Sequence, residues 1–157
     1  MTGVSWRSQT TVLATPEHVM ETLTDTAACA RWSPVPFDLD GGGGHHLQPG
    51  TIRRVSGRLL GAPVRFHLHT LEADSERLRL HARGPIEIRV AYALTAVAEG
   101  CAVDAHVSID APRTPLGRLV GRATRLMLAA GTLDVALRRI AREAERSALR
   151  GLPERSS

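Results

Sequence analysis

Three histidines near the middle of this sequence have a type and spacing that could bind a metal ion. His67 and His69 alternate in the stretch RFHLH, and His81 follows in RLRLHARG. Side chains at positions i and i+2 of a β-strand point to the same face, and zinc enzymes use this His-x-His spacing. Two interpretations follow, a zinc centre or the solvated face of a sheet, and the elements that carry the histidines must decide between them.

The strands around these histidines favour the solvated face. In each of 64–70, 77–82, 86–94 and 103–109, apolar residues alternate with polar or charged ones. Because alternate residues of a strand face opposite ways, each strand has an apolar side and a charged side, and the histidines lie beside arginines on the charged side. A surface rich in cationic side chains repels a divalent metal. We therefore predict no metal and no other cofactor.

The charge of the chain is carried by arginine alone. The 157 residues have a formal net charge of +4 and contain no lysine, which excludes Schiff-base chemistry through a lysine side chain. With 3% aromatic residues, the sequence lacks the stacking surfaces typical of nucleic-acid binding, so we predict no nucleic-acid partner. Cys29 and Cys101 have neither CxxC nor disulfide-framework spacing, and we expect two reduced, structural thiols.

Capping, proline and glycine signals divide the rest of the chain into elements. Thr15-Pro16 is typical of a helix start, and a proline-rich segment stops a second helical stretch. From Thr51 to Ile109 short turns separate alternating strands, which must then be antiparallel neighbours. The expected elements are a strand at 4–13, a helix at 16–23, a short helix at 26–32, a brief strand at 36–40, a glycine-rich loop at 41–50, a meander at 51–109 and an amphipathic helix of about thirty residues at 116–144, with Gly131 as a possible bend.

This order predicts an α+β fold. A curved antiparallel sheet of six to seven strands would wrap its apolar face around the long C-terminal helix, with two short helices after the first strand closing one end. No stretch is long and apolar enough to span a bilayer, and the first residues lack the apolar core of a signal peptide. We expect one domain at 1–150, a disordered tail at 151–157, no integral membrane segment, a cytoplasmic location and a monomer or homodimer.

Three stretches resemble one known superfamily. TVLATPEHVMETLTD followed by CARWSP, then QPGTIRRVSGRLLGAPVRF, and finally LDVALRRIAREAE resemble the SRPBCC (START-like, birch-pollen-allergen-like) superfamily, in particular its bacterial polyketide cyclase/dehydratase-like branch. The resemblance covers about residues 4–146. It implies a helix-grip fold with an internal pocket for apolar molecules such as lipids, sterols or polyketides. Some members of the superfamily are enzymes and others only bind or carry, so the fold alone does not decide the activity.

The pocket wall that these patterns predict is mostly apolar. Its expected ligand-binding residues are Trp32, Phe66, Leu68, Leu78, Leu80, Ile88, Val90, Val107, Ala123, Met127 and Ala130. Its polar members are few, namely Ser8, Thr10, Thr70, Tyr92 and Asp134. The glycine loop with His45 and His46 could act as a lid over the pocket or could simply be a disordered surface loop.

Tyr92, Asp134 and Arg31 are the catalytic candidates. Asp134 could be a buried carboxylate with a raised pKa, or an edge residue paired with Arg138. Tyr92 could orient a substrate, or it could be a core residue with a bonded hydroxyl. Arg31 and Trp32 could clamp a planar or anionic ligand at the pocket mouth, whereas Trp32 could also serve only to plug the end of the fold.

Two main functions remain open. The first is a cyclase or dehydratase without metal, acting on an apolar, carbonyl-containing intermediate such as a polyketide. The second is a non-catalytic binder or carrier of a lipid-, sterol- or quinone-type molecule. Several polar groups within hydrogen-bond reach of one point would favour the enzyme, and a uniformly apolar wall would favour the carrier.

Overall fold

The computed structural model describes residues 4–25, 28–29, 32, 37–39, 46–59, 62–112 and 114–151. The predicted tail beyond Gly151, most of the predicted helix at 26–32 and the glycine loop up to His45 lie outside these residues. In the part of the chain that is described, no helix is long and apolar enough to cross a membrane.

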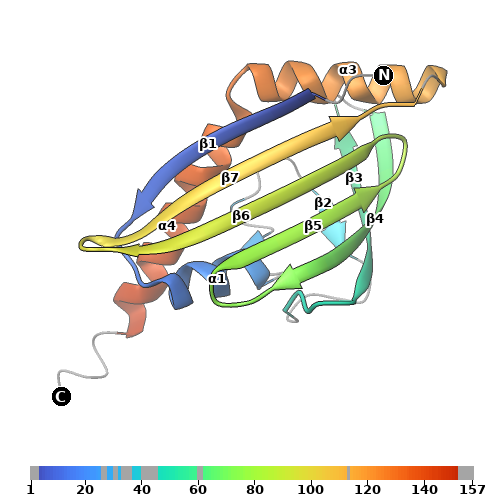
Figure 1. Ribbon diagram of the computed structural model, residues 1–157. Helices are drawn as coiled ribbons and strands as arrows, with labels where there is room; N and C mark the ends of the chain where they lie inside the picture. Colours follow the sequence, from blue (N-terminus) through green and yellow to red (C-terminus); the bar gives the residue numbers. More distant parts are fainter. Residues whose placement is uncertain are drawn as a thin grey trace.

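A seven-stranded antiparallel sheet forms the framework (Figure 1). Its spatial order is β1-β7-β6-β5-β4-β3-β2, so the meander from β2 to β7 is continuous and β1 joins it beside β7. The strands are β1 (Val4–Val12), β2 (Phe37–Leu39), β3 (Ile52–Leu59), β4 (Ala62–Ala73), β5 (Arg77–Arg83), β6 (Glu87–Val97) and β7 (Gly100–Asp110). This arrangement confirms the predicted meander and its α+β class.

Three helices have described bounds: α1 (Pro16–Thr24), α3 (Pro115–Ala129) and α4 (Thr132–Gly151). α1 begins as predicted, because the Thr15 hydroxyl accepts a hydrogen bond from the amide of His18 and proline follows the cap. The long C-terminal helix is divided at Gly131, whose φ of 95° lies in the left-handed region that interrupts an α-helix. The predicted bend is therefore a complete break between α3 and α4.

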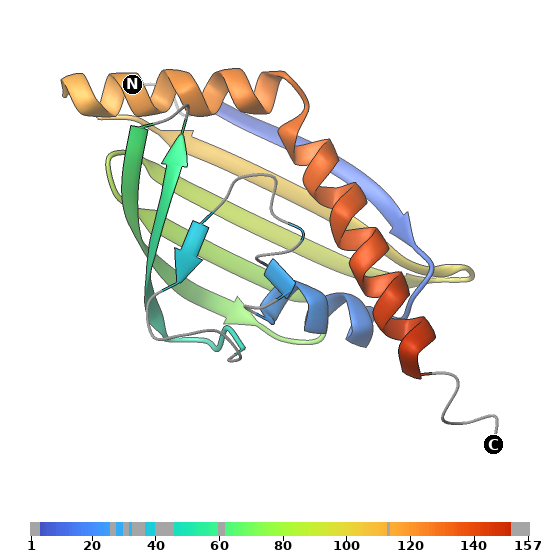
Figure 2. The same cartoon turned by 180° about the vertical axis from the view of Figure 1, so that it is seen from behind.

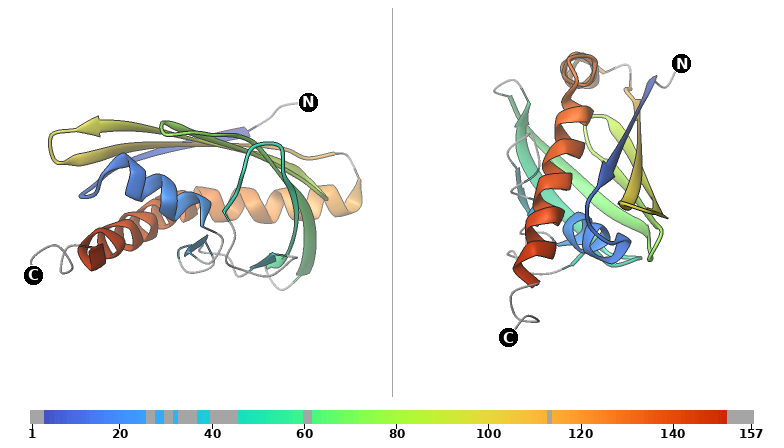
Figure 3. Two further views of the ribbon diagram at one scale, coloured as in Figure 1. Left: turned by 90° about the horizontal axis from the view of Figure 1, so that it is seen from below. Right: turned by 90° about the vertical axis from the view of Figure 1, so that its left-hand side faces the viewer.

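The helices cover the concave side of the curved sheet (Figure 3). α4 runs along β1 and contacts α1, while α3 crosses one end of the sheet and contacts β3 (Figure 2). Gly121 of α3 packs closely against Ala111, where an added Cβ would lie 2.8 Å from the Ala111 methyl carbon. The concave face of the sheet, α1 and α4 together enclose the core.

Strand alternation sorts the two faces as predicted. In β7 every second residue from Cys101 to Ile109 is buried, and the residues between them are half-buried or exposed. On α4 the buried stripe has helical spacing. Its apolar members are Leu133, Ala136, Leu137, Ile140 and Ala144, and Glu143 is buried beside them. The apolar face of the sheet therefore meets the apolar stripe of the helix, and the face with arginine and histidine lies on the convex side.

Candidate functional site

One row of side chains crosses the concave face from β4 to β7. The strand register aligns Thr70 with Leu80, Leu80 with Val90, and Val90 with Val107. Thr70 and Val107, at the two ends of the row, are 2% and 7% exposed, yet Leu80 and Val90 between them are only half-buried. The two middle side chains of this row are thus more exposed than the two at its ends, although all four point toward the helices.

The neighbouring row is also partly open. Leu68, Ala82 and Ile88 are aligned across β4, β5 and β6, and all three are half-buried, while Ile109 beyond them on β7 is fully buried. Two adjacent rows therefore leave accessible apolar surface over β5 and β6, and the second row also over β4. If this face packed directly against a helix, its central residues would be the most buried ones.

The other predicted wall residues have different positions. Phe66 and Leu78 are buried in the core at 8% and 0% exposure, and Ala123 of α3 is buried at 7%. Met127 is half-buried, whereas Ala130 caps the end of α3 and is exposed, so Ala130 lies outside the wall. Trp32 is half-buried, and its indole Nε1 donates a hydrogen bond to the Thr22 carbonyl oxygen at 3.1 Å, which ties the ring to α1.

Thr70 is the polar residue of the wall with an unusual environment. Its side chain is almost fully buried, and its hydroxyl Oγ1 has no hydrogen-bond partner among the described residues. A buried hydroxyl without a partner costs about 1–3 kcal/mol, so such groups are uncommon unless another molecule satisfies them. Thr70 therefore presents an unused donor and acceptor at the edge of the half-buried apolar rows.

The Tyr92 phenol and the Cys29 thiol are buried near each other inside the fold, and both stay protonated at neutral pH. Tyr92 is 6% exposed, and burial, with a smaller effect of the nearby Cys29, raises the pKa of its phenol well above the ordinary value. Burial, and to a smaller extent Asp25, raises the pKa of the Cys29 thiol to about 12. The Cys29 thiol donates to the Leu23 carbonyl oxygen at 3.2 Å. At neutral pH Tyr92 is thus a hydrogen-bond donor and not a base.

Asp134 differs from the buried carboxylate that the helical pattern suggested. It is exposed in the first turn of α4 and accepts a hydrogen bond from the Ser8 hydroxyl of β1. Its described partner is therefore Ser8 and not Arg138. Arg31, the third catalytic candidate, lies outside the described residues, as do Gly41–Gly44 and His45 of the predicted lid.

The histidines of the convex face do not converge on one point. His69 and His81 are 6.4 Å apart between ring centroids, and His67 is exposed on the same side. A carboxylate lies near them, because Glu87 on the neighbouring strand places an oxygen 3.5 Å from His81 Nε2. Among the described residues, the three donor groups that could together hold a metal are elsewhere, at Glu21, Asp25 and His46.

Two grooves of the described residues lie on the convex face, one with a polar and one with a mixed lining. The first, of about 360 Å³, is lined by Gln9, Thr11 and Asp104 among others. The second, of about 210 Å³, is lined by Arg79, Arg89 and His106 together with the apolar Leu71, Leu80 and Val90. Charged and hydroxyl groups suit water better than an apolar molecule, so the concave rows are the better candidate for an apolar ligand.

Comparison with known proteins gives the family. The family model described as polyketide cyclase/dehydrase and lipid transport matches residues 4–145. The chain belongs to this family. It is therefore a member of the SRPBCC superfamily, as its sequence resemblance indicated, and the match spans every strand and most of α4. A comparison with curated protein sequences gives no significant match.

Solved structures share the fold across nearly the whole chain. CV1439 from Chromobacterium violaceum is 18% identical, with a TM-score of 0.67 over 90% of this chain and 96% of that one. Ara h 8.0201 is 13% identical, with a TM-score of 0.59 over 94% and 99% of the two chains. DynU16, a protein of the dynemicin biosynthetic locus, is 25% identical with a TM-score of 0.56, and the match covers 92% of this chain and 48% of DynU16.

Proposed function

We propose that the protein binds a small hydrophobic molecule between the concave face of the sheet and the helices. The observation that carries this proposal is the half-burial of Leu80, Val90 and Ile88 in the middle of an inward-facing wall that is closed at Val107 and Ile109 on β7. Apolar surface left accessible in such a place favours an apolar ligand by about 25 cal/mol for each Å² that the ligand covers.

The wall also suggests what kind of molecule it accommodates. Thr70 supplies one unpaired hydroxyl at the edge of the apolar rows, and Tyr92 supplies a phenol that stays protonated. A mainly apolar molecule with a carbonyl or hydroxyl group would satisfy the Thr70 hydroxyl and remove its desolvation penalty. A purely aliphatic ligand would leave that penalty in place.

Binding without catalysis is the function that the geometry supports best. The sheet places five described polar side chains on its concave side, the half-buried Arg53 opposite Leu68 and the hydroxyl residues Ser8, Thr10, Thr70 and Tyr92, and Ser8 already donates to Asp134. The hydroxyls are not ionised at neutral pH and the guanidinium stays protonated, so none of these groups is a ready general base. An apolar wall with scattered hydroxyls and one guanidinium fits a carrier or binding protein better than a site for proton abstraction.

Cyclase or dehydratase chemistry is the second candidate, and the family match is what favours it. In such a reaction the enol carbon of a polyketide-like chain attacks a carbonyl carbon of the same molecule, and the resulting hydroxyl later leaves with a neighbouring hydrogen as water. Here the Tyr92 phenol would donate a hydrogen bond to the carbonyl that gains negative charge. The wall would hold the chain in a folded conformation and exclude water.

A fluorescent apolar probe tests the binding proposal. Val90→Phe fills the space above the central strands, so we expect it to weaken the binding of N-phenyl-naphthylamine at least tenfold. Ala93→Phe adds a similar bulk on the same strand but on the exposed convex side, and we expect it to change the affinity less than twofold. Equal affinities of Val90→Phe and the wild type would refute the proposed location.

A second experiment separates the enzyme from the carrier. The protein is incubated with benzoylacetone in deuterium oxide, and exchange of the hydrogens between its carbonyls is followed by NMR. Acceleration by the wild type that Tyr92→Phe reduces would support enolisation in the pocket. Probe binding without any acceleration would support a carrier and count against cyclase chemistry.

A further inference from the structure

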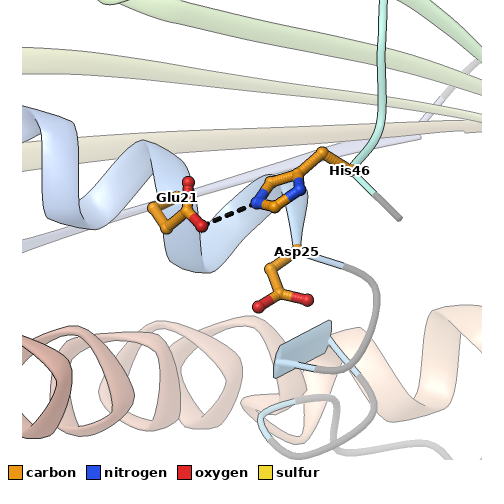
Figure 4. Close-up of side chains that lie close together, drawn as sticks. All are labelled: Glu21, Asp25 and His46. Atoms are coloured by element: carbon orange, nitrogen blue, oxygen red, sulfur yellow. Dashed lines mark hydrogen bonds and ion pairs between the residues drawn. The ribbon is translucent and has the colours of Figure 1, made fainter. Parts of the chain in front are cut away.

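Two carboxylates and one imidazole come together at the end of α1 (Figure 4). Glu21 lies in α1 and Asp25 is the C-terminal cap of this helix, four residues later, while His46 comes from the segment just before β3. His46 Nε2 lies 2.6 Å from Glu21 Oε1, and one donor atom from each of the three residues lies within 4.8 Å of the other two. Three possible metal ligands from two separate parts of the chain thus meet at one place.

The backbone holds these two parts of the chain together. The Leu47 amide donates to the Thr24 carbonyl oxygen at 2.8 Å, and Asp25 and His46 form an antiparallel bridge. The Asp25 amide in turn donates to the Glu21 carbonyl oxygen at 2.9 Å, which continues the helix pattern to its cap. The three side chains are therefore neighbours because of main-chain bonds that do not depend on their own contact.

The donor set suits a divalent transition metal. An imidazole nitrogen together with carboxylate oxygens is a common ligand combination for zinc, and zinc sites with three protein ligands leave a fourth position for water. Bond lengths of about 2.0 Å in a tetrahedron separate the ligand atoms by about 3.3 Å. The hydrogen bond of 2.6 Å between His46 and Glu21 would open slightly, and the Asp25 carboxylate would move inward.

Side-chain rotation can make both movements. Glu21 and His46 are exposed and Asp25 is half-buried, so small torsional changes do not disturb the core. The two carboxylates also lie one helical turn apart, where like charges repel each other, and a bound cation would remove this repulsion. The repulsion between the carboxylates and the positions of the three ligand groups therefore both favour a bound cation.

We propose that Glu21, Asp25 and His46 bind one divalent transition-metal ion of the zinc class. The ion joins the end of α1 to the chain before β3, and so stabilises this junction of the fold. The site is separate from the concave rows, and its existence does not depend on the hydrophobic ligand. It replaces the expectation from the sequence that the chain binds no metal, while the convex histidines remain outside it.

Zinc titration of the tag-free full chain, after treatment with a chelator, tests the proposal. Isothermal titration calorimetry should show one zinc ion per chain, and zinc should raise the melting temperature. We expect His46→Ala and Glu21→Gln each to weaken zinc binding at least about tenfold. Both positions are exposed, so circular dichroism should show that the variants keep the wild-type fold.

His67→Ala is the matched control, because it removes an exposed histidine from the convex face. It should bind zinc as the wild type does. Three results would overturn the proposal: no zinc binding by the wild type, unchanged binding in His46→Ala and Glu21→Gln, or loss of binding in His67→Ala. The last would assign the zinc to the convex histidines.

Discussion

Two leucines on β5 provide a matched test of how the wall is packed. Leu78 and Leu80 have the same chemistry, lie on the same strand and point to the same face of the sheet. Leu78 is fully buried in the core, where it is aligned with Tyr92 of β6. Leu80 is half-buried in the row that joins Thr70 to Val107. Replacing each with alanine removes the same atoms, so any difference in stability reports the surroundings.

The structure predicts a large difference. Leu→Ala at a fully buried position costs about 2.7–5 kcal/mol, because a cavity adds to the lost transfer free energy. At Leu80 the space beside the side chain is already accessible, so only part of the transfer free energy of three carbons is lost, about 1 kcal/mol. The free energies of unfolding of the two variants should thus differ by at least about 1.7 kcal/mol, which corresponds to about twentyfold in the unfolding constant.

Urea denaturation followed by far-ultraviolet circular dichroism measures both free energies. Binding of N-phenyl-naphthylamine provides the complementary readout, because Leu80→Ala should alter the affinity for the probe while Leu78→Ala should leave it nearly unchanged below its unfolding transition. If Leu80→Ala destabilises the fold as much as Leu78→Ala does, then the central row is closed core and the reasoning about the wall is wrong.

The remaining predictions concern the pH dependence and two glycines. Because the pKa of Cys29 is raised from 9.0 to about 12, its contribution to stability is complete below pH 9 and is lost as the pH rises through 12. The free energy of unfolding should fall over this interval by up to about 1.4 kcal/mol per pH unit, and Cys29→Ala should flatten that part of a urea-denaturation series; an unchanged slope would contradict the assignment. Gly100→Ala should abolish or severely reduce thermal stability, because φ is 154° and a Cβ would collide with the Val12 carbonyl oxygen. Gly131→Ala should lower the free energy of unfolding by only about 1 kcal/mol, since φ is 95° but no atom lies within 4 Å of the added Cβ. Equal melting temperatures of the two glycine variants would show that the collision at Gly100 is not real.

Strand alternation made most of the fold predictable from the sequence. The arginine and histidine faces of β4 and β5 and the apolar faces opposite them follow from a period of two, which depends only on neighbouring residues. The same is true of the start of α1, where Thr15 and Pro16 act on adjacent backbone groups. Local rules of this kind were enough to sort the side chains between the two faces of the sheet.

Asp134 shows where a local rule failed. A helical wheel drawn through one continuous helix places Asp134 beside Ala123, Met127 and Ala130 on the apolar stripe. Gly131 interrupts the helix, so α4 begins with a new direction and phase, and Asp134 becomes exposed. The sequence indicated Gly131 as a possible bend. The exposure of Asp134, three residues later, could be seen only from the backbone angles at Gly131.

Contacts between distant segments could not be read from the sequence. The approach of Cys29 to Tyr92, of Glu87 to His81 and of His46 to Glu21 depends on how elements pack or on the register between strands. Single-residue patterns contain no information about such pairs. The sequence therefore offered no sign that His46 lies beside Glu21 and Asp25.

Methyl NMR of the protein bound to N-phenyl-naphthylamine tests the central claim most directly. With labelled leucine, isoleucine and valine methyl groups, intermolecular NOEs locate the probe without any substitution. The account predicts NOEs from the probe to the methyl groups of Leu80, Ile88 and Val90, and none to Leu71, which is exposed on the convex face. NOEs to Leu71 without any to the central row would place the ligand on the opposite side of the sheet and contradict the proposed function.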